Sequence, residues 1–238
     1  MASIDPILRN KKVTAVIPAR NEAASIREVI EETLPYVAEV LVVDGHSADE
    51  TAALARSAGA RVILDRGRGK GDAIRCAIAE IRTEVTVFMD ADGSHRASDI
   101  PRLVDPILRG EADHVGGSRL LGGSSELHGG FDEFFRLAGS SFITACINHR
   151  FGVRISDSQN GFRAIRTEVL RKLGLSEDIT TIEQEMVIRT LNKGYRLSEV
   201  PAHEHARLHG RSSIVLRKVW FRYLWSTCKH LLQPREPA

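Results

Sequence analysis

Residues 13–89 alternate between short apolar runs and segments with helical periodicity, and this pattern restricts the possible folds most strongly. The apolar runs, rich in valine and isoleucine, predict strands at residues 13–17, 40–43, 62–64 and 85–89. The segments between them predict helices at residues 22–34, 49–58 and 72–81. Strands and helices in this order form right-handed βαβ units. We therefore expect an α/β, Rossmann-like fold: a mostly parallel sheet with helices on both faces.

Beyond Asp113 the alternation weakens. The Gly- and Ser-rich residues 116–130 predict a loop. Helices are expected at residues 131–148, 181–192 and 214–232, and strands at residues 161–165 and 196–200. With no internal repeat, we expect a lead-in over residues 1–12, a single domain over residues 13–213, and a C-terminal helix and tail over residues 214–238.

Composition excludes several classes of protein. The chain has 238 residues, 42% hydrophobic and 27% charged, with a net charge of +2, so no global attraction to nucleic acid is expected. Its three cysteines are far apart, which favours a reducing compartment over disulfides or a thiolate zinc site. The N-terminus has no apolar signal core, and no apolar run reaches the ~20 residues of a membrane span. We expect a cytoplasmic protein, soluble or peripheral to a membrane.

Two carboxylates, Asp90 and Asp92, stand where the predicted strand 85–89 ends. In open α/β sheets ligands bind at the carboxyl ends of strands, and two such oxygen ligands can hold a divalent cation. Considered alone, the pair with Gly93 behind it fits an ordinary acidic turn better than a metal site.

Polar residues also follow the other predicted strands. They lie at residues 18–22, 44–49 and 69–72. Carboxylates in such places can accept hydrogen bonds from a ribose or base, although Glu22 and Asp49 also suit the first turn of a helix. The run Gly67-x-Gly69-x-Gly71 matches neither common phosphate-loop pattern.

The order and spacing of these motifs resemble the family 2 glycosyltransferases of the GT-A fold. The shared motifs of the first half are PxxNE at residues 18–22, VVDGHSxDET at residues 42–51, GKGDA at residues 69–73, DAD at residues 90–92 and GSR at residues 117–119. The second half resembles the polyprenyl-phosphate (dolichol-phosphate mannose synthase-like) branch, through residues 117–123, 157–163, 185–186, 199–201 and 207–212.

The resemblance implies a nucleotide-sugar half, residues 13–118, an acceptor half, residues 119–213, and a set of site residues. The donor GDP- or UDP-sugar would contact Pro18, Arg20, Glu22, Asp44, Lys70, Asp90, Ala91, Asp92, Arg119 and Arg207. Mg²⁺ or Mn²⁺ would be held by Asp90, Asp92 and Ser94. Catalysis would rest on Asp92, Arg119, Glu185 and Asp157.

Two positions depart from the family pattern. Ser94 stands where the branch has glutamine as a further metal contact, and Ser213 stands where it has lysine. The first leaves a weaker metal ligand, and the second leaves a phosphate contact unassigned.

The implied activity is metal-dependent, inverting transfer of a hexose to a polyprenyl phosphate. A phosphate oxyanion is already a nucleophile, whereas a hydroxyl acceptor would need Glu185 or Asp157 as general base. Gly69-Lys70-Gly71-Asp72 is similar to the glucosyl-3-phosphoglycerate synthase group, which has a small soluble acceptor. A nucleotidyltransferase and a non-catalytic binding module are the remaining alternatives.

Two other segments have open interpretations. His203-x-His205-x-x-x-His209 is expected to be a polar loop rather than a zinc site. In the C-terminal helix an apolar arc is expected on one side, with basic residues opposite and Phe221 and Trp225 at the edges. The arc comprises Leu216, Val219, Trp220, Tyr223, Leu224 and Leu231, and the basic residues are Lys218, Arg222 and Lys229. This helix could pack on the domain or lie on an anionic membrane.

Overall fold

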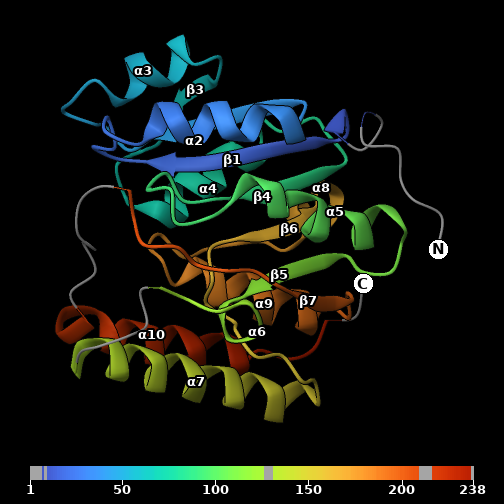
Figure 1. Ribbon diagram of the computed structural model, residues 1–238. Coiled ribbons are helices and arrows are strands. Elements are labelled where there is room, and N and C mark those ends of the chain that lie inside the picture. The colour runs from blue at the N-terminus through green and yellow to red at the C-terminus, as the bar shows by residue number, and fades with distance from the viewer. Residues whose placement is uncertain (1–6, 8–9, 126–130, 209–215, 237–238) are drawn as a thin grey trace.

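The computed structural model describes residues 7, 10–125, 131–208 and 216–236, with side chains for all of these but 131–136 and 216–219. Its strands form one seven-stranded sheet, in the order β3-β2-β1-β4-β6-β5-β7. They are β1 (Val13–Ala19), β2 (Glu39–Asp44), β3 (Arg61–Leu64), β4 (Val85–Phe88), β5 (His114–Ser118), β6 (Arg163–Arg166) and β7 (Leu197–Pro201). Figure 1 shows this sheet running through the molecule.

The sheet is mostly parallel, as predicted. Strand β1 pairs in parallel with β2 and β4, β2 with β3, and β5 with β7, whereas β6 runs antiparallel to both β4 and β5. Phe88 and Gly116 both pair with Arg163 at the start of β6. The residues that precede β6 therefore lie at the edge where β4 and β5 end.

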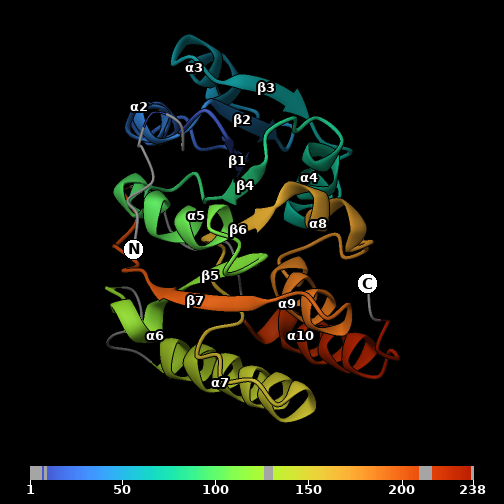
Figure 2. The same cartoon turned by 90° about the vertical axis from the view of Figure 1, so that its right-hand side faces the viewer.

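Helices cover both faces of the sheet (Figure 2). The described α-helices are α2 (Ile26–Thr33), α3 (Thr51–Ser57), α4 (Lys70–Ile78), α5 (Ile100–Leu108), α6 (Arg119–Gly122), α7 (Phe131–Phe151), α8 (Thr167–Lys172), α9 (Ile182–Asn192) and α10 (Leu216–Leu231). Two 3₁₀ turns, η1 (Leu34–Tyr36) and η2 (Ala97–Asp99), complete the set.

The core follows the alternation of side chains along each strand. Val13, Ala15 and Ile17 of β1 face α2 and α5 in one apolar cluster, and Val16 faces α4, α8 and α9 in another. A third cluster joins the other side of α9 to α7 and α10, including Ile147 and half-buried Tyr223. Within the described part of the chain, no helix is long and apolar enough to cross a bilayer.

The predicted loop at residues 116–130 is wrong in its first part, because β5 extends to Ser118 and α6 follows directly. Glycine at position 117 allows the neighbouring residues Ala202 and Phe162 to pack closely against the backbone of β5. A β-carbon on Gly117 would lie 2.9 Å from the β-carbon of Ala202 and 3.0 Å from the carbonyl oxygen of Phe162. The predicted strands and helices of residues 13–89 are present, with ends shifted by a few residues.

Candidate active site

The loops that follow β1 and β2 are tied to each other by short polar side chains. Asn21 adopts a left-handed backbone with φ 57°, which asparagine tolerates, and its amide nitrogen donates to Ser47 Oγ at 2.9 Å. Its side-chain oxygen accepts from the amide of Ala48 at 2.8 Å. The amide of Glu22 donates to Thr51 Oγ1 at 2.8 Å. These bonds hold the two loops in one shape.

Asp44 ends β2 with its carboxylate buried in this loop pair. Ser47 donates to it twice, from its hydroxyl at 2.5 Å and from its amide at 3.2 Å. Arg20, by contrast, is exposed. Its β-carbon lies against Gly45, where an added β-carbon would be 3.3 Å away. Asp44 and Arg20, both predicted to contact the donor, thus lie at the same edge of the sheet. Asp44 is buried and held by Ser47, whereas Arg20 is exposed.

Lys70, the first residue of α4, forms a trio with Asp90 and Glu183. Its ammonium nitrogen lies 2.5 Å from Asp90 Oδ1 and 2.6 Å from Glu183 Oε1. Burial alone would raise the pKa of Asp90, but the ammonium outweighs burial and holds that pKa well below its usual value. The two carboxylates in turn raise the pKa of Lys70 despite its burial.

Gly161 closes over this trio. A β-carbon there would lie 3.0 Å from Lys70 Nζ, 3.1 Å from Asp90 Oδ2 and 3.2 Å from Glu183 Oε1, so a larger residue would press on all three charged groups. Buried Arg163 donates to the backbone oxygens of Asn160 and Glu183, which fixes this loop to α9. A small hollow beside the trio is lined by Pro18, Lys70, Ile74, Phe88, Met89, Asp90, Gly161, Arg163, Glu183 and Met186.

Asp92 lies under the segment that follows β7. Its Oδ1 accepts from the amide of Ser94 at 3.1 Å and from the hydroxyl at 2.7 Å, and its Oδ2 lies 3.0 Å from Arg207 Nη1. The backbone oxygens of Asp92 and Ser94 accept from the amides of Leu208 and His205, at 3.0 and 2.9 Å. Residues 205–208 are therefore bound directly to the turn that carries Asp92.

Glu22 adds a third carboxylate to this region. Burial is the largest cause of its raised pKa, and the charges of Asp92 and Asp90 raise that pKa further. Ala91, between the two aspartates, is buried, and its carbonyl oxygen accepts from Ser25 Oγ at 2.8 Å. Carboxylate crowding of this kind is what a bound cation relieves.

The oxygen ligands of Asp90, Asp92 and Ser94 are the type that Mg²⁺ and Mn²⁺ prefer, so these residues fit a divalent cation. Among the residues with described side chains, no three His, Cys, Asp or Glu are grouped to hold a metal by themselves. A cation here would take its remaining ligands from a bound diphosphate and water.

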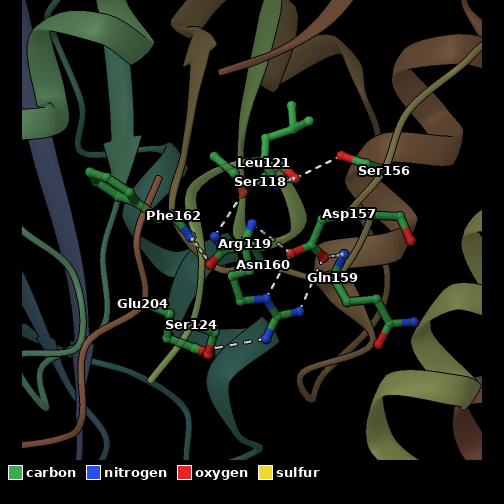
Figure 3. Close-up of polar contacts among 12 residues, drawn as sticks. Ser118, Arg119, Leu121, Ser124, Ser156, Asp157, Gln159, Asn160, Phe162 and Glu204 are labelled. Atoms are coloured by element: carbon green, nitrogen blue, oxygen red, sulfur yellow. Dashed lines mark hydrogen bonds and ion pairs between the residues drawn. The ribbon is translucent and has the colours of Figure 1, made fainter. Parts of the chain in front are cut away.

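Arg119, at the start of α6, is clamped between two carboxylates (Figure 3). Its Nε and Nη2 donate to Asp157 at 2.7 and 3.0 Å, and its Nη1 lies 3.4 Å from Glu204. Burial would raise the pKa of Asp157, but Arg119 and the amide of Gln159 lower it. Asp157 is thus a paired carboxylate, poorly suited to take a proton from an acceptor.

His95 connects the Asp90 turn to the loop before β6. Its Nδ1 accepts from the amide of Asp90 at 3.3 Å, so Nε2 carries the proton and donates to Asn160 Oδ1 at 3.2 Å. The ring stacks on Phe162 with centroids 4.9 Å apart. Asn160 also donates to the backbone oxygen of Gly117 at 2.7 Å, which links the ends of β4, β5 and β6.

The structure does not bring Glu185 to the site, which corrects its expected role as a base. Its carboxylate is fully buried and accepts from the amides of Ser176 and Glu177 and from Arg189. Glu183, two residues earlier, points to the site instead, because positions two apart lie about 200° around a helix. The helical periodicity of α9, which places Glu183 and Glu185 on opposite sides of the helix, could have distinguished the two residues.

Glu183 is the site residue that sequence reasoning missed. Conversely, Gly69 and Gly71 have a packing role: added β-carbons would lie 2.9 Å from the backbone oxygen of Asp178 and 2.4 Å from that of Glu177. Of the expected phosphate-side motif, residues 209–213, including His209, lie outside the described part of the chain, as does the side chain of Lys218.

Comparisons with known proteins give the family and the fold. The model of glycosyl transferase family 2 matches residues 14–174. The chain is 32% identical over 200 residues to glycosyltransferase AglJ of Haloferax volcanii, which covers 83% of this chain and 64% of that protein. It is 33% identical over 196 residues to a dolichyl-phosphate hexose transferase of the same organism, covering 79% of this chain and 81% of that one. The chain thus spans just under two thirds of the first of these relatives.

Solved structures share the architecture. Glucosyl-3-phosphoglycerate synthase from Mycobacterium tuberculosis, in complex with Mn²⁺, UDP-glucose and phosphoglyceric acid, superposes with a TM-score of 0.75 at 24% identity. That match covers 94% of this chain and 81% of the other. A structure described as a mycobacterial protein gives a TM-score of 0.77 at 22% identity, covering 94% and 76%. The predicted GT-A fold is confirmed.

Proposed function

Because the chain belongs to glycosyl transferase family 2, we propose that it transfers a hexose, with inversion, from a nucleotide-diphosphate sugar to the phosphate of a polyprenyl phosphate. The observation that carries the choice of acceptor is the pairing of the carboxylates. Asp157 is bound by Arg119, and Glu183 by Lys70. A hydroxyl acceptor needs a carboxylate that can take its proton, whereas a phosphate acceptor does not.

The donor would bind across the loops that follow β1, β2 and β4. Pro18, Arg20 and Asp44 would contact the nucleoside, with Asp44 already oriented by Ser47. Lys70 and Asp90, held together, would face the diphosphate from the start of α4. A divalent cation bound by Asp90, Asp92 and Ser94 would neutralise the charge that develops on the leaving diphosphate.

The two arginines would bind phosphate groups. A planar guanidinium can bond two phosphate oxygens at once. Arg119 now binds Asp157 through two nitrogens in this way, and Arg207 binds Asp92 through one nitrogen. Phosphate binding would then exchange one anionic partner for another. His95 and Asn160 would keep the Asp90 turn and the loop before β6 in register while this occurs.

The names of relatives support a lipid acceptor. One relative is a dolichyl-phosphate hexose transferase, and another, 28% identical over 222 residues, is an undecaprenyl-phosphate 4-deoxy-4-formamido-L-arabinose transferase from Edwardsiella ictaluri. Such an acceptor would bring the protein to a membrane surface, on the cytoplasmic side that the cysteine content favours.

A second candidate is a small soluble acceptor that carries a phosphate. Gly69-Lys70-Gly71-Asp72 is similar to the glucosyl-3-phosphoglycerate synthase group, and that enzyme shares this fold. Arg119 would serve either acceptor, since both present a phosphate. The two candidates differ in the apolar chain and in the nucleophile, which is a phosphate oxygen in a polyprenyl phosphate and a hydroxyl in phosphoglycerate.

The deciding experiment incubates the purified full chain with labelled GDP- and UDP-hexoses and one of two acceptors, a short-chain polyprenyl phosphate or 3-phosphoglycerate. Each reaction runs with Mg²⁺, Mn²⁺ or a chelator, beside Asp92→Asn as inactive control and Glu80→Gln as matched surface control. We expect metal-dependent transfer to the polyprenyl phosphate. Transfer to 3-phosphoglycerate alone would select the second candidate, and transfer to neither with any donor would overturn both.

A further inference from the structure

Helix α10 presents three large aromatic side chains to solvent. Phe221 and Trp225 are each 64% exposed, Trp220 is 53% exposed and Leu232, just beyond the helix, is 84% exposed. Trp220, one residue of the expected apolar arc, therefore faces away from the core. Tyr223 and Leu231 do pack against α9, as expected of that arc.

Among the described side chains of α10, the fully buried ones are polar, and the helix makes directional contacts on this side. Ser226, Thr227 and His230 are buried. His230 Nε2 lies 3.0 Å from Glu177 Oε1, and the hydroxyl of Tyr223 lies 2.6 Å from Thr180 Oγ1. Because hydrogen bonds require a defined direction, they fix the rotation of the helix and keep the aromatic side chains outward.

The excess positive charge of the chain is concentrated in residues 205–235, which include α10. Residues 205–235 contain seven of the 33 Lys and Arg residues and none of the 31 Asp and Glu residues. The rest of the chain has 26 basic and 31 acidic residues and is net negative. Within the described helix, Arg222 is exposed beside Phe221 and Trp225.

We propose that the exposed side of α10, formed by Trp220, Phe221, Arg222, Trp225 and Leu232, docks on the surface of an anionic lipid bilayer. Aromatic side chains are favoured at the boundary between head groups and acyl chains, and basic residues are attracted to anionic head groups. A second copy of the chain is a poor occupant, because it would bring the same excess of positive charge to the contact.

The docking surface is also well placed for a lipid substrate, and in this respect the inference rests on the proposed function. Leu208, whose amide donates to Asp92, is separated from the start of α10 by residues 209–215. The eight residue steps from Leu208 to Leu216 span at most about 29 Å, so the helix begins within that distance of Leu208. Figure 1 shows α10 and α7 side by side at one end of the molecule, below β5 and β7.

Intrinsic fluorescence tests this directly, because Trp220 and Trp225 are the chain's two tryptophans. The full chain is mixed with vesicles of phosphatidylcholine, alone or with phosphatidylglycerol, at low and high salt. We expect a blue shift and co-sedimentation with the anionic vesicles, reduced at high salt. Absence of both at low salt, in the wild-type protein, would overturn the inference.

Variants locate the contact while keeping both reporters. Phe221→Ser with Leu232→Ser should weaken vesicle binding at least ten-fold, and Arg222→Gln roughly five-fold. Leu64→Ser, which changes a 58% exposed residue on edge strand β3, is the matched control and should bind like wild type. Equal binding by all three would overturn the assignment of this surface.

Self-association and transfer are measured separately from vesicle binding. A concentration-dependent blue shift with self-association, in the absence of vesicles, would assign the surface to a second copy and overturn the proposal. Transfer to a water-soluble short-chain acceptor reports on the proposed function alone. Vesicle binding without transfer would refute that function and leave the docking surface, and transfer without vesicle binding would do the reverse.

Discussion

The loops after β1 and β2 and the region that carries Arg119, Lys70 and Asp90 meet at the same sheet edge, but the two regions are held in different ways. The first pair is joined by neutral hydrogen bonds of Asn21, Ser47 and Thr51. The second region is held by ion pairs, chiefly Arg119 with Asp157 and Lys70 with Asp90 and Glu183.

This difference separates two kinds of preparation for a ligand. The proposed nucleoside side is already shaped, so donor binding there would order little. On the proposed phosphate side the cationic groups already have carboxylate partners, so a phosphate or a cation would have to displace an existing bond. The specificity for a phosphate acceptor would then depend on how readily those pairs exchange.

The largest expected effect is that of Asp92→Asn on the phosphate side. Loss of this carboxylate should lower metal-dependent transfer roughly 10³-fold, since one charge-stabilising group at a reacting centre contributes about that much. Stability should change far less than turnover, because asparagine retains an acceptor for Ser94 and loses only the charge that pairs with Arg207. Turnover and thermal melting measure the two effects. Wild-type turnover in this variant, with metal still required, would contradict the assignment.

Lys70→Met should have the largest effect on stability. It leaves Asp90 and Glu183 side by side without their cation, and loss of a charged hydrogen bond in this partly buried trio costs about 2 kcal/mol. Urea unfolding measures this, with Lys70→Arg as the control that keeps the charge. A methionine variant as stable as wild type would show that the trio is not a structural unit.

On the nucleoside side, Asp44→Asn should weaken donor binding by about ten-fold, the value of one charged hydrogen bond, with little change in turnover at saturation. Calorimetry with the nucleoside diphosphate gives the affinity. Asp65→Asn, a nearby buried carboxylate outside the predicted set, is the comparison. Equal affinity in wild type and Asp44→Asn would place the nucleoside elsewhere.

The smallest effect is expected for Glu22→Gln, where the two regions meet. Because the pKa of Glu22 is raised above its ordinary 4.5, the folded state binds this proton more tightly than the unfolded chain. Its ionised form therefore costs stability above the folded pKa and costs none below pH 4.5. The glutamine variant should melt slightly higher than wild type at neutral pH and equally in acid. A lower melting temperature at neutral pH would contradict the crowding of carboxylates.

The difference between local patterns and long-range contacts explains how much of the structure could be predicted from the sequence. The strands at residues 13–89 follow from local apolar alternation, and the positions of Asp90 and Asp92 follow from where one strand ends. Strand β6 was found, but not its antiparallel place between β4 and β5, since pairing over about 75 residues leaves no local pattern. The pairing of Arg119 with Asp157, and the choice of Glu183 over Glu185, depend on the same long-range geometry.

The place of β6 also has a consequence for how the chain folds. Strand β4 ends at Phe88 and remains an unprotected sheet edge until β6, beginning at Arg163, has left the ribosome and inserted beside it. Strand β5 is synthesised earlier than β6, but it is connected to β4 in the sheet only through β6. A fragment that stops at Ser118 would therefore expose the apolar run Val85–Phe88 to pairing with other chains, and we expect such a fragment to aggregate rather than fold as a nucleotide-binding module.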